Sequence, residues 1–463
     1  MHAHDADDTS DPSSPSPVHD AYAAIRRGNF RRYWLGNVLS ILGRQMLTVT
    51  VVWEVYKRTG DPFDVGLVGL VQVIPVLSLA LVAGHVADRF DRKLVLSCAM
   101  GLSVSASLGL AAVSYYEWHL AGTYGCLFLL GVARAFLQAS KNSLVPQLVP
   151  RAIFSNAVTW NLGGFQLASV AGPALGGWTL ALFGHAYVVY LIDAAAATTF
   201  IVLLAGLRRR RGEVSHETAT LKSLAEGISF VWHHKVILGA MALDMFAVLL
   251  GGAKALLPVF AKDILHVGPF GYGWLAAAEA IGALTMSLTL MHRPPMARAG
   301  RSLLLSVAGF GIAICIFGIS RSFTLSFVAL FFTGTFDCIS VIVRHTLVQM
   351  LTPDRMRGRV SAISGMFIST SNELGEFESG TLARFTSPVF AVVFGGIGTL
   401  AVVILAAVGN PQLRRYGRLD GGDLRDEGTQ RRGEGISVVA IDAAIENARV
   451  PDGTDVSPAR SAR

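Results

Sequence analysis

The sequence alternates between long apolar runs and short polar clusters. Twelve apolar runs follow one another between residues 30 and 408, and most have about 20 residues or more, the length that crosses the ~30 Å hydrocarbon core of a bilayer as a helix. Strands of a membrane β-barrel would instead be about ten residues of alternating polarity, which excludes that fold. The pattern therefore predicts an all-α membrane protein with twelve transmembrane helices. The predicted spans are Phe30–Tyr56, Asp64–Ala87, Leu94–Ser114, Leu120–Ala139, Ser155–Phe183, Ala186–Leu207, Val236–Ala261, Phe270–Met291, Ser302–Ile319, Phe323–Leu351, Val360–Ala383 and Pro388–Val408.

The composition supports this prediction. Hydrophobic residues make up 52% of the 463 residues and charged residues only 15%, against roughly 25% charged residues in soluble domains. We assign the net charge of +7 to basic loops, so no nucleic-acid partner is expected. The cysteines lie inside apolar runs without metal-ligand spacing, so neither a disulfide nor a metal site is expected. They are Cys98, Cys126, Cys315 and Cys338.

Basic residues gather in alternate loops, and this predicts the orientation of the chain. Loops rich in Lys and Arg lie on the cytoplasmic side of a membrane. An even number of spans places both termini on that side, so both are predicted to be cytoplasmic. The basic loops contain Arg26, Arg27, Arg31 and Arg32; Arg89, Arg92 and Lys93; Arg208 to Arg211, Lys222 and Lys235; Arg293, Arg298 and Arg301; Arg355, Arg357 and Arg359; and Arg414, Arg415 and Arg418. The loops on the other side hold Lys57, Arg58, Lys262, Arg321 and Arg384.

An internal repeat divides the chain into two halves. A shift of 203 residues without gaps aligns glycines, prolines and helix ends, which fix the shape of the backbone. The aligned pairs include Leu148 with Leu351, Pro150 with Pro353, Gly172 with Gly375 and Gly177 with Gly380. The predicted organisation is a disordered cytoplasmic tail (1–25), an N-terminal six-helix bundle (26–207), a cytoplasmic linker (208–235), a C-terminal six-helix bundle (236–410) and a cytoplasmic tail (411–463).

Two motifs in the N-terminal half connect the chain to a known family. The charged turn Gly84–Lys93 follows the second span, and a run of glycines surrounds Gly172-Pro173 on the fifth. The turn resembles the loop between helices 2 and 3 of the major facilitator superfamily, with Asp91 where that pattern has glycine. The glycine run resembles the motif that antiporters of the superfamily carry in the same place. The resemblance implies that these motifs control conformation, through Gly84, Asp88, Arg89, Arg92, Gly172 and Pro173.

Three shorter stretches are similar to one branch of that superfamily. They are Trp53–Tyr56, Leu257-Pro258 and Ser371–Phe377, and they resemble the enterobactin (siderophore) exporter branch of the drug:proton antiporters. This resemblance implies a multi-pass protein of the bacterial inner (plasma) membrane, driven by the proton gradient.

Ionised and polar side chains inside the spans predict a substrate cavity. A charged residue in the middle of a membrane costs ~2.5 to 3.5 kcal/mol on insertion scales, so it normally faces a partner or a wet cavity. Arg134 and Asp337 are equivalent in the repeat, and we expect them to face each other. Lys141 and Arg344 are also equivalent, although both could instead extend to the membrane surface. The predicted cavity, which looks cationic and suited to an anionic catecholate, contains Arg44, Gln45, Arg134, Gln138, Lys254, Asp337 and Arg344.

Acidic residues on the eleventh span predict the route of the proton. Glu373 and Glu376 lie three residues apart and share a helix face, whereas Glu378 lies about 200° round the helix from Glu376. A buried carboxyl group favours its neutral form, which a proton carrier requires. We therefore predict coupling through Glu373, Glu376 and Asp337, with Glu279 and Asp244 as weaker candidates. The alternative is that the acids only neutralise neighbouring basic residues.

These observations predict a transporter and exclude direct use of ATP. No Walker lysine follows a glycine-rich loop, and no catalytic triad appears, so we expect neither an enzyme nor a cofactor. The predicted function is proton-coupled export of a small organic molecule, first of all a siderophore of the enterobactin type. The expected partners are this substrate, protons and membrane lipid, and we expect a monomer. The alternatives are a multidrug efflux pump, an inward-directed nutrient or lysophospholipid transporter, and a membrane sensor that transports nothing.

Overall fold

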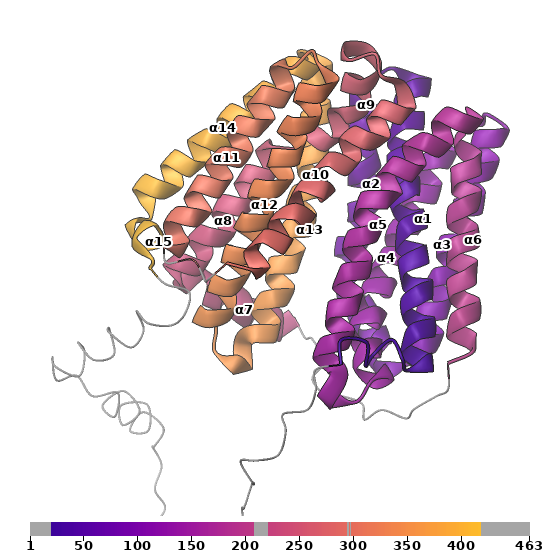
Figure 1. Ribbon diagram of the computed structural model, residues 1–463, viewed down its shortest axis with the longest axis horizontal. Coiled ribbons are helices and arrows are strands. Elements are labelled where there is room, and N and C mark those ends of the chain that lie inside the picture. The colour runs from indigo at the N-terminus through magenta and orange to yellow at the C-terminus, as the bar shows by residue number, and fades with distance from the viewer. Residues whose placement is uncertain (1–19, 208–220, 294–295, 297, 418–463) are drawn as a thin grey trace, which may run out of the picture.

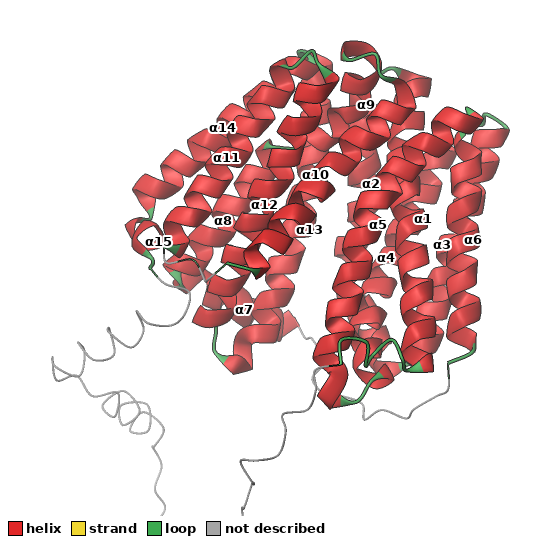
Figure 2. Cartoon of the chain, viewed as in Figure 1, coloured by secondary structure: helices red, strands yellow, loops and turns green. Residues whose placement is uncertain are grey.

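The computed structural model describes residues 20–207, 221–293, 296 and 298–417. The predicted tails, 1–25 and 411–463, lie largely outside these residues, as does the first part of the predicted linker. Figure 2 shows helices joined by short loops, and no strand occurs in the described residues.

Twelve long helices form two bundles in the described part of the chain (Figure 1). The N-terminal bundle consists of α1 (Gly28–Thr59), α2 (Pro62–Arg89), α3 (Arg92–Tyr115), α4 (Leu120–Leu148), α5 (Phe154–Phe183) and α6 (Ala186–Ala205). The C-terminal bundle consists of α8 (Lys235–Leu250), α10 (Gly268–Met291), α11 (Ala299–Ile319), α12 (Phe323–Leu351), α13 (Asp354–Phe385) and α14 (Pro388–Gly409). Shorter elements are η1 (Arg151–Ile153), α7 (Leu221–His233), η2 (Ala253–Leu256), α9 (Leu257–Val259), η3 (Phe260–Ile264) and α15 (Pro411–Arg415).

The turn between α1 and α2 shows how the sequence ends one helix and starts the next. Gly60 follows α1 with φ of 66°, a left-handed conformation that glycine adopts without strain. The Asp61 carboxylate then accepts a hydrogen bond of 2.9 Å from the Phe63 N–H, and Pro62 occupies the first helical position. Two antiparallel spans therefore follow each other across a tight turn.

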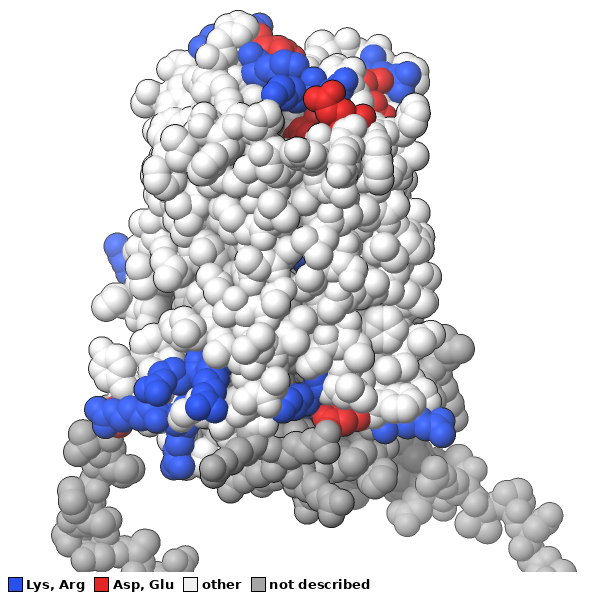
Figure 3. Space-filling model, turned by 90° about the vertical axis from the view of Figure 1, so that its right-hand side faces the viewer, with Lys and Arg blue, Asp and Glu red and all other residues white. Residues whose placement is uncertain are grey.

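The surface has the charge distribution of a membrane protein. Figure 3 shows charged side chains gathered at the two ends of one face and a broad band between them in which few charged side chains appear. Ten helices of the described chain are long and apolar enough to cross a membrane. Two long helices are not among these ten: α5, which is rich in glycine and polar residues, and α13, which contains Glu373, Glu376 and Glu378. The predicted all-α membrane fold is confirmed.

The seventh predicted span differs from the continuous helix that we expected. α8 ends at Leu250, and the chain passes through Gly251-Gly252 before η2, α9 and the π-helical turn η3 continue the span. A Cβ atom on Gly251 would lie 2.7 Å from the Phe310 ring, and one on Gly252 would collide with the Gly375 backbone. The two glycines thus let the chain leave the helix where α11 and α13 approach closely.

The two bundles are joined at one end of the molecule. We call the end at which α1 begins and α7 lies the linker end, and the end at which α1 ends the opposite end. Figure 1 shows the bundles converging at the opposite end and diverging toward the linker end. Packing between bundles is mainly that of α5 with α10 and of α2 with α13.

Two pairs of glycines allow this close contact. A Cβ atom on Gly177 of α5 would lie 2.6 Å from the Gly273 Cα atom of α10. A Cβ atom on Gly380 of α13 would lie 3.0 Å from the Gly66 Cα atom of α2. Because Gly177 and Gly380 are equivalent in the repeat, the same contact occurs once on each side of the molecule.

Side chains add to the junction at the opposite end. The Trp53 and Tyr272 rings stack with their centroids 5.3 Å apart. The Asp61 carboxylate forms an ion pair of 3.1 Å with Arg384, and the Tyr56 hydroxyl donates a hydrogen bond to Asp263.

The buried hydrophobic residues follow the same division. One core cluster at the opposite end contains residues of both bundles, including Trp53, Tyr190 and Phe317. At the linker end each bundle has a core of its own, around Phe200 in the N-terminal bundle and Leu347 in the C-terminal bundle. The structure is therefore closed at the opposite end, where the two bundles share one core.

Candidate transport cavity

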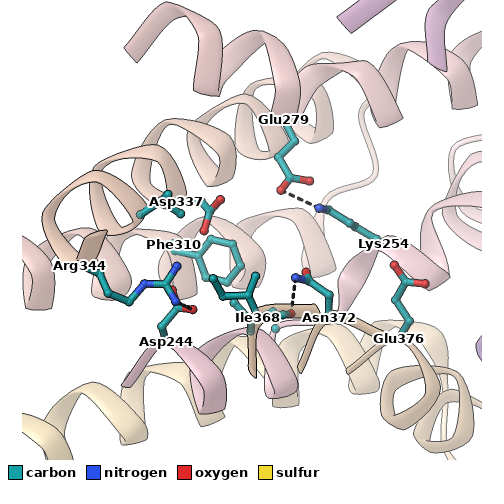
Figure 4. Close-up of a pocket in the computed structure, with 13 residues that line it drawn as sticks. Asp244, Lys254, Glu279, Phe310, Asp337, Arg344, Ile368, Asn372 and Glu376 are labelled. Carbon is teal, nitrogen blue, oxygen red and sulfur yellow. Dashed lines mark hydrogen bonds and ion pairs between the residues drawn. The ribbon is translucent and has the colours of Figure 1, made fainter. Parts of the chain in front are cut away.

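A cavity of about 90 Å³ lies within the C-terminal bundle, and six segments supply its lining (Figure 4). They are α8, the glycine break with η2, α10, the middle of α11 and α12, and α13. The lining residues are Asp244, Val248, Gly251, Gly252, Lys254, Glu279, Phe310, Asp337, Val341, Arg344, Ile368, Asn372 and Glu376.

Lys254 enters the cavity from the glycine break. Its ammonium group lies 3.0 Å from the Glu279 carboxylate of α10. A continuous helix would carry this side chain in a different direction, so the break positions the lysine. Glu279 was a weaker candidate in the sequence analysis, because nothing in the local sequence indicates that it would lie opposite Lys254.

Arg344 and Asp244 form a buried ion pair at the inner wall of the cavity. Their side chains are only 3% and 5% exposed, and the guanidinium nitrogen Nη1 lies 2.5 Å from the carboxylate. The Arg344 Nε atom has no hydrogen-bond partner in the described residues. Arg344 therefore does not extend to the membrane surface, which decides between the two alternatives left open for this residue.

Asp337 and Glu376 face the cavity without such a partner. Figure 4 shows the Glu376 carboxylate on the side of the cavity where Lys254 lies and the Asp337 carboxylate on the side where Arg344 lies. Neither makes an ion pair with another described residue, whereas both cations of the lining are paired with other acids. The lining therefore contains four carboxyl groups and two cations. The expectation of a cationic cavity does not hold for this part of the site.

Arg134 and Glu373 connect the two bundles beside the cavity. The Arg134 guanidinium of α4 donates a hydrogen bond of 2.9 Å to the Glu373 carboxylate of α13. The arginine side chain is 46% exposed and the glutamate side chain 14%. Arg134 does not pair with Asp337, as we had expected from the repeat, because Asp337 points into the cavity of its own bundle.

Arg44 and Gln45 lie apart from this cavity, in the N-terminal bundle. Arg44 donates a hydrogen bond to the Ser103 hydroxyl and lies 3.5 Å from the buried Asp193 carboxylate. The Gln45 amide donates a hydrogen bond of 3.1 Å to Ser169 of α5. Gln138, one turn after Arg134, is exposed.

Lys141, the repeat equivalent of Arg344, lies over the Phe200 ring. Its ammonium nitrogen is 5.6 Å from the ring centroid, a distance typical of a cation–π contact. The two equivalent cations therefore have different surroundings, since one faces a carboxylate and the other an aromatic ring.

The charged turn after α2 contacts the end of α6 through Lys93, whose ammonium group donates hydrogen bonds of 2.9 and 3.0 Å to the Ala205 and Leu207 carbonyl oxygens. No atom outside the immediate backbone would lie within 4 Å of a Cβ atom on Gly84, so no helix packs against it. Asp91, where the superfamily pattern has glycine, caps α3 by accepting a hydrogen bond of 2.9 Å from the Lys93 N–H. Arg89 is exposed at the end of α2, Arg92 begins α3, and the Asp88 side chain is not among those the structure describes.

The glycine motif of α5 lies between two other helices. Gly172 packs against Leu42 and Gln45 of α1, and a Cβ atom on Gly176 would lie 3.0 Å from the Met46 carbonyl oxygen. The Pro173 carbonyl oxygen would lie 2.7 Å from a Cβ atom on Gly273 of α10. The motif thus joins α5 to its own bundle and to the other one.

Phe310 and Asn372 are lining residues that the sequence analysis missed. Phe310 belongs to an apolar span in which nothing distinguishes it from its neighbours. The Asn372 amide donates a hydrogen bond of 2.8 Å to the Ile368 carbonyl, one turn earlier in α13. The consecutive glycines Gly251 and Gly252 were the one sequence signal for a close contact here, because they let α11, which carries Phe310, approach the chain.

Two six-helix bundles, one of which encloses a charged cavity, define a membrane transporter of the major facilitator type. Residues 19–451 match the family described as transmembrane secretion effector, and the chain belongs to this family. The resemblance that the sequence motifs indicate is therefore confirmed.

Named relatives are enterobactin exporters. The enterobactin exporter EntS of Shigella boydii serotype 18 is 29% identical over 396 residues, which cover 84% of this chain and 93% of the exporter. The exporter of the same name from Escherichia coli O157:H7 has the same identity and coverage.

Solved structures with the same fold are more distant in sequence. The nucleoside transporter NupG has a TM-score of 0.62 and 14% identity over 84% of this chain and 99% of the other. A bacterial homologue of the human lysosomal transporter Spinster, in an inward-facing and unoccupied conformation, has a TM-score of 0.63 and 14% identity over 83% of this chain and 95% of the other.

Proposed function

We propose that this protein exports a siderophore of the enterobactin type across the bacterial inner membrane in exchange for protons. The family and the enterobactin exporters among the relatives support the cargo and the direction. The acidic residues of α13 support the coupling, because one of them lies between the bundles and another lies in the cavity. In this proposal both chain termini are cytoplasmic, the linker end faces the cytoplasm and the protein works as a monomer.

The ion pair between Arg134 and Glu373 is the observation that carries the coupling proposal. It joins the two bundles beside the contact between α2 and α13. The pair exists only while Glu373 is ionised, so an empty and unprotonated transporter is held in its present conformation. A proton on Glu373 removes the negative charge and releases Arg134. Bound cargo would release the same pair by competing for one of the two side chains.

The proton gradient provides the energy for this exchange. Each proton that crosses the membrane releases ~2.3 kcal/mol per 100 mV of potential. An exporter that changes conformation only with cargo or with a proton uses this energy to accumulate cargo outside. Glu376 and Asp337 are carboxyl groups of the cavity, and in this proposal each binds either cargo or a proton.

The alternatives predict different substrates for the same fold. A multidrug efflux pump would transport cationic dyes, and an inward-directed transporter would take up nutrients or lysophospholipids. A membrane sensor would bind a ligand without moving it. We prefer transport to sensing because ionised side chains inside a membrane cost free energy. Such residues on both sides of the contact between the bundles have a use in a protein that changes conformation.

Accumulation in inverted membrane vesicles tests the proposal. A radiolabelled catecholate siderophore should enter vesicles that contain the protein when the inside is made acidic, and the uptake should stop when an uncoupler collapses the gradient. Glu376→Gln should abolish uptake, whereas Glu378→Gln, on another face of α13, should retain it. Equal uptake with and without the gradient would refute proton coupling, and no uptake of any siderophore would refute the cargo.

A further inference from the structure

The guanidinium group of Arg344 has more hydrogen-bond donors than partners. It donates to the Asp244 carboxylate through Nη1, and its side chain is only 3% exposed. The Nε atom has no hydrogen-bond partner in the described residues, although Arg344 lines the cavity of the C-terminal bundle. Because a buried donor without an acceptor costs free energy, an acceptor that reaches this guanidinium group from the cavity would be stabilised there.

Asp337 is an acceptor without a donor at the same end of the cavity. It lies seven residues before Arg344 on α12, which places both side chains on one face of the helix. Helical side chains lean toward the N-terminus of their helix, so the arginine extends toward Asp337. The two groups form no ion pair with each other in the part of the chain that the structure describes. The gap between them therefore has a donor on one side and an acceptor on the other.

An uncharged planar amide has the chemistry that matches this gap. Its carbonyl oxygen accepts a hydrogen bond from Arg344 and its N–H group donates one to an ionised Asp337, and hydrogen bonds to charged groups are stronger than neutral ones. A carboxylate would instead be repelled by Asp337, and an ammonium group by Arg344. Phe310 adds an aromatic ring to the lining, against which a flat amide group packs.

The size of the cavity suits one such group rather than a whole cargo molecule. Pockets for drug-sized ligands have roughly 300 to 1,000 Å³, whereas this cavity has about 90 Å³. The Lys254 side chain, which lines the cavity, is 54% exposed, so the cavity is open on that side. A cargo molecule would therefore insert only one part of its structure.

We propose that Arg344 and Asp337 form a subsite for an uncharged amide group of the cargo, with the amide carbonyl on Arg344 and the amide N–H on Asp337. This inference rests on the proposed function and adds the chemical class of the group that the cavity recognises. A proton on Asp337 removes the negative charge that strengthens the hydrogen bond, so the amide and the proton compete for one carboxyl group.

Binding of matched probes to the full-length protein in lipid nanodiscs tests this inference without a proton gradient. N-methyl-para-fluorobenzamide and methyl para-fluorobenzoate share their ring and carbonyl group, and only the amide donates a hydrogen bond. Fluorine NMR should show that the amide binds at least about tenfold more tightly than the ester, with empty nanodiscs as the lipid background. The anionic probe para-fluorobenzoate and the cationic probe para-fluorobenzylammonium should both bind more weakly than the amide.

Variants assign the binding to the two side chains. Asp337→Leu removes the acceptor and should lower the affinity for the amide by about tenfold, to that of the ester. Arg344→Lys keeps a cation for Asp244 but removes the Nε donor, and should weaken binding of the amide and the ester alike. Glu378→Gln is the matched control, because its carboxylate accepts a hydrogen bond from Ser379 outside the cavity. Size-exclusion profiles establish that the variants are folded.

The outcomes separate this inference from the proposed function. A preference for the amide that Asp337→Leu abolishes, without siderophore transport in vesicles, would support the subsite and refute siderophore export. Siderophore transport together with equal binding of the amide and the ester would overturn the subsite and leave export intact. Tighter binding of the anionic or the cationic probe than of the amide would also overturn the subsite, as would an amide preference that persists in Asp337→Leu.

Discussion

Arg134 and Glu373 lie 239 positions apart in the chain and form an ion pair of 2.9 Å between the two bundles. α4 supplies the arginine and α13 the glutamate, so the pair connects helices of different bundles. Three residues further along α13, Glu376 lines the cavity. One helix therefore carries both a carboxylate that pairs with the other bundle and a carboxylate that lines the cavity.

We predict that a methyl group at Gly177 prevents closure of the opposite end. In Gly177→Ala the new Cβ atom would lie within 2.6 Å of the Gly273 Cα atom, and neither backbone can yield without separating α5 from α10. Transport should be lost while the protein remains folded, as measured by vesicle uptake and by size-exclusion chromatography. Gly163→Ala on the same helix is the control, since no atom lies within 4 Å of the added group. Full transport by the Gly177 variant would show that the contact is dispensable.

The ion pair between Asp61 and Arg384 should bias the conformational equilibrium modestly. Partly exposed ion pairs contribute ~0.2 to 1 kcal/mol, so Arg384→Ala should change the ratio of closed to open molecules by roughly 1.5- to 5-fold. Double electron–electron resonance measures this ratio. The method gives the distance between spin labels placed on the loop after α1 and at the end of α13. Arg58→Ala removes an ion pair within α1 and should leave the ratio unchanged. Equal effects of both variants would contradict a specific role of Arg384.

Removing one partner of the buried pair of Arg344 and Asp244 should destabilise the C-terminal bundle strongly. Arg344→Met leaves Asp244 buried without its partner and should lower the free energy of unfolding by about 3 to 5 kcal/mol. Replacing both residues, in Asp244→Leu with Arg344→Met, should recover much of this loss, because no unpaired charge then remains. Denaturant titration in detergent micelles measures both values. If the double variant is no more stable than Arg344→Met, the unpaired charge of Asp244 is not the cause of the loss, and the prediction is wrong.

The helices could be predicted from the sequence because span length and loop charge are local properties. Each of the twelve predicted spans contains a helix, and the motifs identified the superfamily. The break at Gly251-Gly252 was not predicted, since glycines also occur inside continuous membrane helices. Its cause is the approach of α11 and α13, which only the three-dimensional packing determines.

Pairing between the bundles was harder to predict than the list of charged residues. The repeat correctly indicates that Arg134 and Asp337 occupy equivalent places, but equivalence does not require contact. Arg134 contacts Glu373 because α2 and α13 meet in this conformation, whereas Asp337 faces the cavity. Partners of a transporter's charges depend on its conformation, and a single sequence does not specify which conformation is observed.

The most direct test measures two activities of the Glu373→Gln variant. One is the exchange of siderophore across the membrane, and the other is accumulation of siderophore driven by a proton gradient. Proteoliposomes containing this variant should still exchange external for internal siderophore, because a neutral residue 373 releases Arg134 in every cycle. They should fail to accumulate siderophore when a proton gradient is imposed, while the wild-type protein and Glu378→Gln accumulate it. Accumulation by Glu373→Gln at the wild-type level would contradict the account, since the ion pair between Arg134 and Glu373 would then have no part in coupling.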